Sequence, residues 1–526
     1  MQFRKMPLRR DDSRGKRMKV LIVTPEITYV PQGMGNIALH LSAKAGGLGD
    51  VSASLVSALF EMGADVHIAL PHYRRMFHTE ITDLLDAKLK RYFEAFHSHG
   101  RDNVARIHLA EDRAFYYRES VYSKSSEDSL RMSLTFQREV INHIIPELHP
   151  DLIHCNDWMT GLIPAFARRV GIPSLFTVHN IHTQKTTLEQ IENFGIDTAM
   201  FWEDLYFERQ PYNYEETRSN NAVDLLTSGI FSAHFINTVS PTFLKEIVER
   251  RHGFVPPQIQ EQMANKFHAG CAVGILNAPD PDYAPEHDKY LVEKYTAENF
   301  MTAKRQNKVA LQEALGLKID PDAPLFFWPS RLDPIQKGPQ LLTDILYNVI
   351  HDYWESGLQL AIVADGAYQQ YFVDIMRQHG FYERMAVHGF NERLSHLAYA
   401  ASDFLLMPSR FEPCGLPQMI GPLYGTLPLV HDTGGLHDTV EHLDVGADFG
   451  NGFVFRFYDS QGLRWAFDEA MRFYHQPQDV RIRNIVRIMN DAKARFNHDV
   501  TANSYIKLYE QMLQRPLIPG KADNKD

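Results

Sequence analysis

Short apolar runs and longer segments with helical spacing alternate along the first half of the chain. Runs rich in β-branched residues, such as 19–24 (KVLIVT) and 174–178 (SLFTV), predict buried strands. Strands this apolar are covered on both faces, and their alternation with helices implies parallel pairing. The other strands expected here are 65–70, 151–154 and 235–239, and the helices are 51–62, 130–145 and 158–170. The pattern therefore predicts a doubly wound α/β unit.

A second series of the same kind begins near Leu325 with the run LFFWPS, whose first four residues we expect in the core. Its further strands are expected at 359–364, 385–389, 404–407 and 427–431. Its helices are expected at 340–353, 368–379 and 394–401, followed by helical segments at 462–474, 480–496 and 500–513. Two doubly wound units thus follow one another along the chain.

A stretch rich in Pro and Asp, NAPDPDYAPEHD, separates the two series and predicts a linker at 277–290. We expect a Rossmann-like domain on each side of it, the N-terminal one at 18–276 and the C-terminal one at 291–499. Residues 500–526 are expected to form a helix that packs back on the first domain, and a tail. Residues 1–17 carry seven Lys and Arg and predict a basic, disordered tail. The predicted fold class is α/β, with two doubly wound parallel sheets facing a cleft.

Composition narrows the class of function. The chain has 526 residues, which is too long for one ordinary core. Its net charge of −11 argues against binding to nucleic acid or acidic membranes. Three widely spaced cysteines indicate a reducing, cytoplasmic compartment and no cysteine-based zinc site. No apolar run reaches the roughly 20 residues that cross a bilayer, so no membrane span is expected.

Polar residues follow the predicted strands at the point where each strand ends. In open parallel sheets, ligands bind beyond the carboxyl ends of the strands, and two such edges predict a cleft for a small ligand. A Gly-rich loop, 44–51 (KAGGLGDV), opens the first helix. The polar residues at strand ends are Glu26, Asn156, Asp157, His179, Asn180, Ser240, Arg331, Lys337, Asp365 and Glu412.

The stretch 408–418 (PSRFEPCGLPQ) predicts a loop between a strand and a helix start, followed by the turn TGGL at 433–436. The first amides of a helix have no partner within it, so such a loop can hold a phosphate. Glu412 would stand at the mouth of that anion site. By itself the stretch fits equally well a Pro-rich connection in which Glu412 is a solvated cap.

Eight motifs settle this choice by resemblance. KAGGLGDV, HCNDW, TVHNI, NTVSPT, GILNAPD, SRLDPIQKG, PSRFEPCGL and DTGGLHDTV, in this order, resemble the bacterial glycogen synthases and plant starch synthases over nearly the whole chain. The resemblance implies the two-domain GT-B fold and a retaining glucosyltransferase. It implies transfer of glucose from a nucleotide sugar, typically ADP-glucose, to the non-reducing end of an α-1,4-glucan (glycogen), with no metal and no cofactor.

The resemblance also implies roles for individual residues. Arg331 and Lys337 match the family's diphosphate-binding pair, Glu412 its essential glutamate, and His179 the histidine beside the transferred glucose. Asp157 matches an aspartate of the HDW-type block, and a helix cap is its structural alternative. Cys414 fits either packing or a thiol of lowered pKa at a helix start. The substrate-binding residues implied are Lys44, Gly46, Gly47, Asn277, Cys414, Gly415, Leu416, Thr433, Gly434 and Gly435.

The chain departs from the family pattern at four places. Residues 27–43 replace a short loop, Pro417 stands where Thr is usual, and 181–186 (IHTQKT) replaces an aromatic-containing stretch. The spacing from Arg331 to Lys337 is one residue longer than usual. Two alternatives therefore stay open: a UDP-glucose-dependent transferase with another acceptor, and a catalytically weakened relative that binds glucan or nucleotide. A glycoside hydrolase is disfavoured, since it needs two carboxylates flanking the bond.

Overall fold

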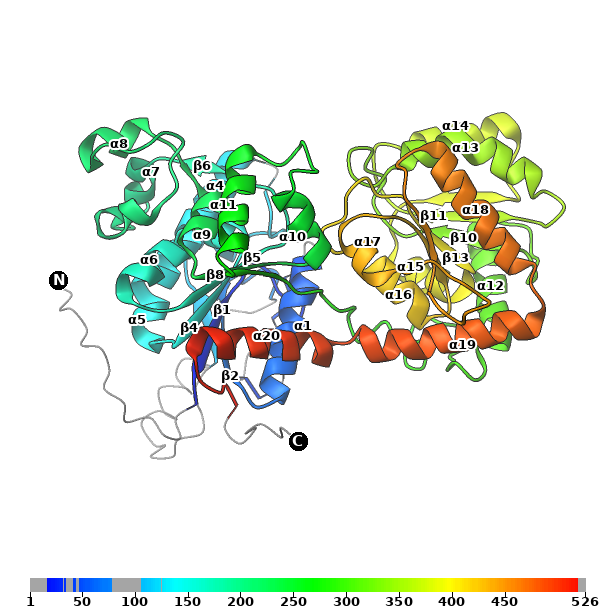
Figure 1. Ribbon diagram of the computed structural model, residues 1–526, viewed down its shortest axis with the longest axis horizontal. Coiled ribbons are helices and arrows are strands. Elements are labelled where there is room, and N and C mark those ends of the chain that lie inside the picture. Colours follow the sequence, from blue (N-terminus) through cyan, green and yellow to red (C-terminus); the bar gives the residue numbers. More distant parts are fainter. Residues whose placement is uncertain are drawn as a thin grey trace. The chain divides into compact units, whose positions relative to one another are not determined.

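The computed structural model describes residues 17–31, 33–34, 41–43, 47–77, 106–123 and 125–518. The chain folds into two compact units (Figure 1). Unit 1 takes its described residues from 1–239, 244–275 and 501–526, and unit 2 consists of 240–243 and 276–500. All but the last residue of the predicted basic tail, 1–17, lies outside the described residues.

The sheet of unit 1 has seven parallel strands among the described residues, in the order β3-β2-β1-β4-β5-β8-β9. Because β1 lies near the middle and the chain winds outward from it in both directions, the predicted doubly wound fold is confirmed. The strands are β1 (Lys19–Val23), β2 (Asp65–Pro71), β3 (Ile107–Ala110), β4 (Leu152–Asn156), β5 (Ser174–Val178), β8 (Phe235–Thr238) and β9 (Ala272–Gly274). The sequence pattern missed β3 and β9, because β9 has only three residues and the four of β3 (IHLA) are interrupted by His108.

Of the three helices expected around this sheet, those at 51–62 and 130–145 begin close to their expected positions, the third needs a correction, and α3 and α7 to α11 were not predicted. The helix expected at 158–170 is instead a 3-10 turn, Trp158–Thr160, followed by a helix that starts at Ile163. A Cβ atom on Gly161 would lie 2.0 Å from the Leu225 carbonyl oxygen, so this close packing fixes the chain at the break. The helices are α1 (Gly47–Glu61), α3 (Arg113–Tyr116), α4 (Ser126–Glu139), α5 (Ile145–Leu148), α6 (Ile163–Val170), α7 (Leu188–Asn193), α8 (Tyr214–Asn220), α9 (Leu225–Ser232), α10 (Pro241–Val248), α11 (Pro257–His268) and α20 (His498–Leu513).

Three smaller features complete the secondary structure of unit 1. A π-helical turn, Val140–Ile144, joins α4 to α5, so the helix expected at 130–145 is one continuous but irregular rod. Short 3-10 turns occur at Thr198–Met200 and Trp202–Asp204. A separate antiparallel pair is formed by β6 (Lys185–Thr186) and β7 (Val223–Asp224).

The sheet of unit 2 has six parallel strands, in the order β12-β11-β10-β13-β14-β15. The strands are β10 (Leu325–Trp328), β11 (Gln359–Val363), β12 (Met385–His388), β13 (Phe404–Met407), β14 (Leu427–His431) and β15 (Phe453–Phe455), and only the three-residue β15 was not predicted. The helices are α12 (Phe300–Leu315), α13 (Pro339–Asp352), α14 (Gln369–His379), α15 (Glu392–Ala401), α16 (Pro417–Leu423), α17 (Gly434–Thr439), α18 (Ser460–Tyr474) and α19 (Gln478–Arg495).

Strand β10 shows why the predicted core stripe is buried on both sides. Phe326 and Trp328 pack into a core with helices α13, α14 and α18. Leu325 and Phe327 point the other way and pack with α12, α15 and α16. Alternation of side chains along a strand thus puts two apolar layers on one sheet, as a doubly wound fold requires.

The last helix, α20, packs on the sheet of unit 1 through a chain of buried polar groups. The Tyr509 hydroxyl lies 2.7 Å from His154 Nδ1, and His154 Nε2 lies 2.6 Å from Thr177 Oγ1. Thr177 donates to Asn237, whose amide donates to the Tyr505 hydroxyl at 3.0 Å. Burial lowers the pKa of His154 to about 3, so its ring is neutral, donates through Nε2 and accepts through Nδ1. The network therefore ties α20 to strands β4, β5 and β8.

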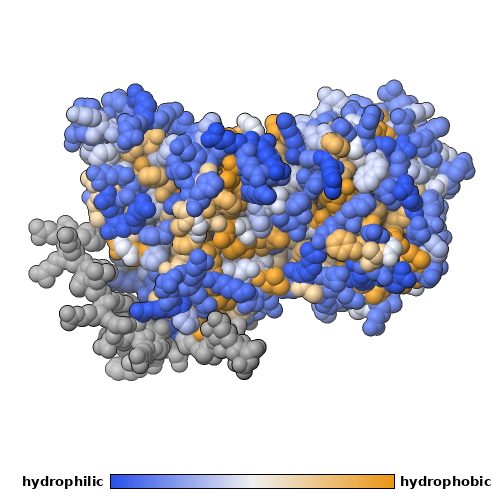
Figure 2. All heavy atoms as spheres, viewed as in Figure 1, coloured by the Kyte–Doolittle hydropathy of each residue, from blue (hydrophilic) through white to orange (hydrophobic). Residues whose placement is uncertain are grey.

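The surface of the described chain is mostly polar on the face shown in Figure 2. Among the described residues, no helix is both long enough and apolar enough to cross a membrane.

Candidate active site

Glu412 lies in the loop between β13 and α16, buried in unit 2 with 4 % of its surface exposed. Its Oε2 atom accepts from Lys337 Nζ at 2.5 Å and from the Ser409 hydroxyl at 3.0 Å. Pro417 is the first residue of α16, where its restricted φ favours the helix and its missing N–H is not needed. The solvated-cap interpretation of Glu412 is therefore wrong.

Two glycines bring the turn after β14 against this loop. The Gly435 amide donates to the Glu412 carbonyl oxygen at 2.9 Å. A Cβ atom would lie 2.0 Å from the Glu412 oxygen if placed on Gly434, and 2.0 Å from the Cys414 oxygen if placed on Gly435. The φ angle of Gly434 is +46°, in the left-handed region. Thr433, buried, precedes α17 as its N-cap residue. Only glycine at both positions allows the two backbones to meet.

Cys414 and Asn277 lie together in the same part of unit 2. Burial raises the pKa of the Cys414 thiol to about 12, although the backbone N–H of Asn277 donates to it and opposes the shift. The interpretation of Cys414 as a thiol of lowered pKa is thus wrong, and its side chain packs in the loop. The Asn277 Oδ1 atom is buried and has no hydrogen-bond partner in the described part of the chain. Gly415 takes a left-handed φ of +74°, and Leu416 is the N-cap residue of α16.

Arg331 follows β10 and is exposed. Its guanidinium forms no hydrogen bond or ion pair with any described residue. Lys337, by contrast, is held by Glu412, with 12 % of its side chain exposed. Unit 2 thus brings Lys337, Glu412 and the glycine turn together and leaves Arg331 free to bind an incoming group.

Asp157 is the centre of a second polar group, in unit 1. Its backbone has φ 57° and ψ −179°, a conformation that residues other than glycine rarely adopt. The carboxylate does not cap the following turn, so the capping interpretation is wrong. One oxygen accepts from the His179 amide at 2.8 Å, and the other accepts from Asn180 Nδ2 at 3.0 Å. Burial raises the pKa of Asp157 to about 7, against the lowering effect of these bonds, and the charge of Glu26 adds to the rise.

The His179 ring has a defined protonation state. Asn156 donates its amide to the Val23 carbonyl oxygen at 3.1 Å, which directs Asn156 Oδ1 to His179 Nε2 at 2.9 Å. The Nε2 atom of His179 therefore carries the hydrogen, and Nδ1 is left as an acceptor. Burial lowers the pKa of His179 to about 3, so the ring is neutral near pH 7. The ring is thus held through Nε2, and its Nδ1 atom can accept a further hydrogen bond.

Glu26 and Tyr122 belong to this group but were not assigned to the site from the sequence. The Tyr122 hydroxyl donates to Glu26 Oε1 at 2.9 Å, and Glu26 is 1 % exposed. Burial, with the charge of Glu26, raises the pKa of Tyr122. Glu26 had a sequence signal, because it follows the first strand. Tyr122 had none, since it lies in an irregular segment between α3 and α4.

The Gly-rich loop is described only in part. Lys44 and Gly46 lie outside the described residues, whereas Gly47 is exposed and opens α1. The longer segment 27–43 is closed at its base by two backbone bonds between Ile27 and Ala43, at 2.7 and 3.0 Å. Within the described ranges, no three His, Cys, Asp or Glu side chains are grouped so that they could hold a metal ion.

Two successive doubly wound units, each with polar side chains beyond the carboxyl ends of its strands, form the architecture of the GT-B class of glycosyltransferases. Family models agree with this. Residues 19–257 match the starch synthase catalytic domain, and residues 316–485 match the glycosyl transferases group 1.

Individual relatives show to which family the chain belongs. The glycogen synthase of Exiguobacterium sibiricum is 34 % identical over 458 residues, covering 82 % of this chain and 89 % of the relative. That of Moorella thermoacetica is 32 % identical over 519 residues, covering 95 % and 98 %. The catalytic domain of starch synthase IV from Arabidopsis thaliana, solved with ADP and acarbose, has a TM-score of 0.72 at 26 % identity and covers 95 % of this chain and 100 % of that one.

The chain belongs to the glycogen synthase family. It is a retaining glucosyltransferase that takes glucose from a nucleotide sugar and adds it to a glucan. The resemblance carried by the eight motifs is thereby confirmed.

Proposed function

We propose that this enzyme uses ADP-glucose and extends the non-reducing end of an α-1,4-glucan such as glycogen, with no metal or other cofactor. The ADP in the starch synthase IV structure supports the choice of nucleotide. The observation that carries the proposal is the buried pair of Lys337 and Glu412 beside the glycine turn of unit 2.

The pair explains how a carboxylate can stand beside a diphosphate. An unpaired Glu412 would repel the phosphate groups, whereas Lys337 offsets its charge and keeps N–H donors for phosphate oxygens. The exposed Arg331 adds a planar fork that can bind two oxygens at once. In this proposal both cations stabilise the charge that develops on the leaving diphosphate, and Glu412 accepts from hydroxyls of the glucose.

The group in unit 1 supports a role in holding the transferred glucose. Both oxygens of Asp157 already accept hydrogen bonds, which suits a positioning residue better than a nucleophile. The neutral His179 offers hydrogen bonds without adding charge. Retention then requires attack on the same face: the bond from C1 to the diphosphate breaks, C1 joins the acceptor hydroxyl oxygen, and a diphosphate oxygen takes the hydroxyl proton.

The remaining assignments complete the proposal. Lys44, Gly46 and Gly47 would cover the donor, and Asn277, Thr433 and residues 414–416 would line its site. The exclusion of water by a closed site would protect the donor from hydrolysis. A cytoplasmic location is part of the proposal, supported by three free cysteines and by the bacterial relatives.

The test is release of nucleoside diphosphate from ADP-glucose or UDP-glucose, with and without glycogen. Wild type is compared with Glu412→Ala and with Glu383→Ala, which changes an exposed glutamate of the same unit. We expect glycogen-dependent release of ADP, lost only in Glu412→Ala. Faster release of UDP would assign the other donor, and a folded protein that releases neither would be the weakened, glucan- or nucleotide-binding relative.

A further inference from the structure

A cavity of about 220 Å³ opens in unit 2, at the amino-terminal edge of its sheet. Asp403, Phe404 and Leu427 line it where β13 and β14 begin, and Asp322 lines it just before β10. In a parallel sheet this edge lies opposite the carboxyl ends, where Glu412 and the glycine turn are found. The cavity is therefore separate from the candidate active site. At about 30 Å³ per water, it has room for roughly seven waters or a small metabolite.

The cavity has an unusual charge. Four cationic side chains line it, and only two carboxylates. The cationic residues are Lys304, Arg305, Lys308 and Arg481, and the acidic ones are Asp322 and Asp403. When Lys304 is charged, the lining carries an excess of two positive charges, which matches a phosphate dianion.

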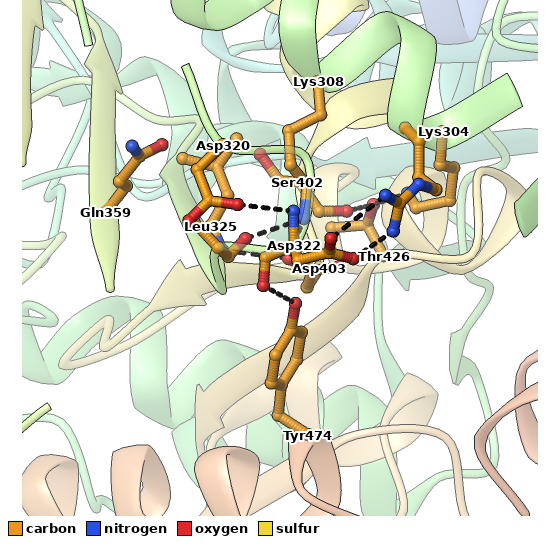
Figure 3. A network of polar contacts seen from close by, with 12 residues as sticks. Lys304, Lys308, Asp320, Asp322, Leu325, Gln359, Ser402, Asp403, Thr426 and Tyr474 are labelled. Atoms are coloured by element: carbon orange, nitrogen blue, oxygen red, sulfur yellow. Dashed lines mark hydrogen bonds and ion pairs between the residues drawn. The ribbon is translucent and has the colours of Figure 1, made fainter. Parts of the chain in front are cut away.

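The two lysines are fixed in place but keep donor capacity. Lys304 Nζ donates to the Tyr424 carbonyl oxygen at 3.0 Å and to the Thr426 hydroxyl at 2.9 Å. Lys308 Nζ donates to the Ala323 carbonyl oxygen at 2.8 Å and to Asp403 at 2.6 Å. An ammonium group has three N–H donors, so each lysine has one left for a further acceptor. Figure 3 shows both lysines entering this polar network from the same side.

The two arginines that line the cavity differ in their partners. Arg305 is paired with Asp322. Arg481, on the first turn of α19, has its guanidinium 5.1 Å from the centre of the Tyr474 ring. Its Nε atom is buried and has no hydrogen-bond partner among the described residues. The Tyr474 hydroxyl donates to the Asp322 carbonyl oxygen at 2.7 Å, which fixes the position of the ring (Figure 3). An unpaired, half-buried arginine is costly unless an anion joins it.

We propose that this cavity is a second binding site, for a small metabolite that carries a phosphate group, with Arg481 as its main ligand and the free N–H donors of Lys304 and Lys308 as further ligands. The aromatic walls, Phe473 and Tyr474, give room for the organic part of a phosphate ester. The state of Lys304 agrees with this. Burial lowers the pKa of Lys304 to about 7; the charge of Asp403 opposes this shift, and the charge of Lys308 adds to it. A bound phosphate dianion would favour the charged form of the lysine.

The site can be tested by calorimetric titration of the full chain at pH 7 with inorganic phosphate, glucose 1-phosphate and glucose. We expect both phosphates to bind and glucose not to bind. Tighter binding of the ester would assign the site to phosphate esters, and equal affinity would assign it to free phosphate. Arg481→Gln should weaken binding about ten-fold or more, since it removes a charged hydrogen-bond donor.

Three further variants separate this site from other causes. Arg483→Gln changes an exposed arginine of the same helix that pairs with Asp448 outside the cavity, and it should bind as wild type does. In Lys337→Gln that is shown to be folded, the phosphate binding that depends on Arg481 should persist, because the cavity is not the proposed diphosphate site. Arg305→Gln should weaken binding and serves if Arg481→Gln proves unfolded.

Several results would overturn the proposal. One is an absence of phosphate binding at millimolar concentration. Another is loss of binding in Lys337→Gln with retention in Arg481→Gln, which would place the phosphate at the site of Glu412. Equal weakening by Arg483→Gln and Arg481→Gln would show attraction to surface charge only.

Discussion

Replacing Asp157 by Asn should make unit 1 less stable in acid and more stable at alkaline pH. In the wild type the carboxylate accepts from the His179 amide and from Asn180 Nδ2. The Asn side chain keeps the first bond. It loses the second, because two amide N–H groups then face each other and Asn180 Oδ1 is already bound to the His182 amide at 2.8 Å. This loss lowers the free energy of unfolding by about 1 kcal/mol at every pH.

The greater stability of Asp157→Asn at higher pH follows from the direction of the pKa shift of Asp157. The pKa of Asp157 is raised from 3.8 to about 7 in the folded chain. Stability from holding the proton is therefore complete below about pH 4 and is lost as pH rises through 7. A shift of three pKa units corresponds to about 4 kcal/mol in the free energy of unfolding. The wild type loses this amount as the pH rises from about 4 to about 7, and Asp157→Asn does not. The two proteins should have equal free energies of unfolding near pH 5, and at pH 8 that of the variant should be higher by roughly 3 kcal/mol.

Calorimetric melting of both proteins at pH 5, 6, 7 and 8 tests this. A lead of roughly 3 kcal/mol corresponds to about 5–10 °C in a unit of this size. Contributions from histidines occur in both proteins and cancel in the difference. A difference that does not change between pH 5 and 8, or one that falls with pH, would refute the reasoning.

Asp65→Asn is a control in the same unit, because the pKa of Asp65 is shifted in the opposite direction to that of Asp157. Burial raises the pKa of Asp65, but the hydrogen bond with His67 and the charge of Arg106 outweigh it, so the pKa is lowered overall. This carboxylate contributes stability above its ordinary pKa of 3.8, and that stability is lost only as pH falls through the lowered value. The variant should therefore be less stable than wild type by a constant amount from pH 5 to 8.

Three further predictions follow from contacts already described. Lys337→Met leaves the buried Glu412 unpaired and should destabilise unit 2 by about 3 kcal/mol, most of which Lys337→Met/Glu412→Gln recovers; equal melting temperatures in calorimetry would contradict this. Gly434→Ala should lower the transfer rate more than about ten-fold, because its Cβ would displace the Glu412 loop, and a wild-type rate would show that the loop tolerates it. Tyr509→Phe removes the partner of His154 and should lower stability by about 1–3 kcal/mol, seen as faster hydrogen exchange in α20; unchanged exchange would count against the network.

The sequence predicts most of the fold because strands of four or more apolar residues carry their own signal. Ten strands were predicted where the structure has them, and both sheets have the expected parallel pairing. Strands β9 and β15 were missed because they have only three residues, and β3 (IHLA) because His108 interrupts its apolar run; such segments pair only when a neighbouring strand is already in place. Strand formation there depends on the tertiary fold.

The sequence predicts the candidate site only in part, for a related reason. The loop of Glu412 and the turn at Gly434 are visible as motifs, but their contact depends on two backbones meeting at a distance that the sequence does not state. The bond between Glu26 and Tyr122 joins residues 96 positions apart. In the separate cavity of unit 2, the pairing of Lys308 with Asp403 likewise spans 95 positions. Such pairs become predictable only when the order of strands is known.

The return of the last helix to unit 1 has a consequence for the growing chain on the ribosome. Unit 2 occupies a nearly continuous stretch that is complete before α20 is synthesised. Strands β4, β5 and β8 of unit 1 must wait, with His154 and Asn237 lacking their tyrosine partners, until α20 has been made. The unit that is begun first is thus completed last, and a chain whose synthesis stops before α20 has its defect in unit 1.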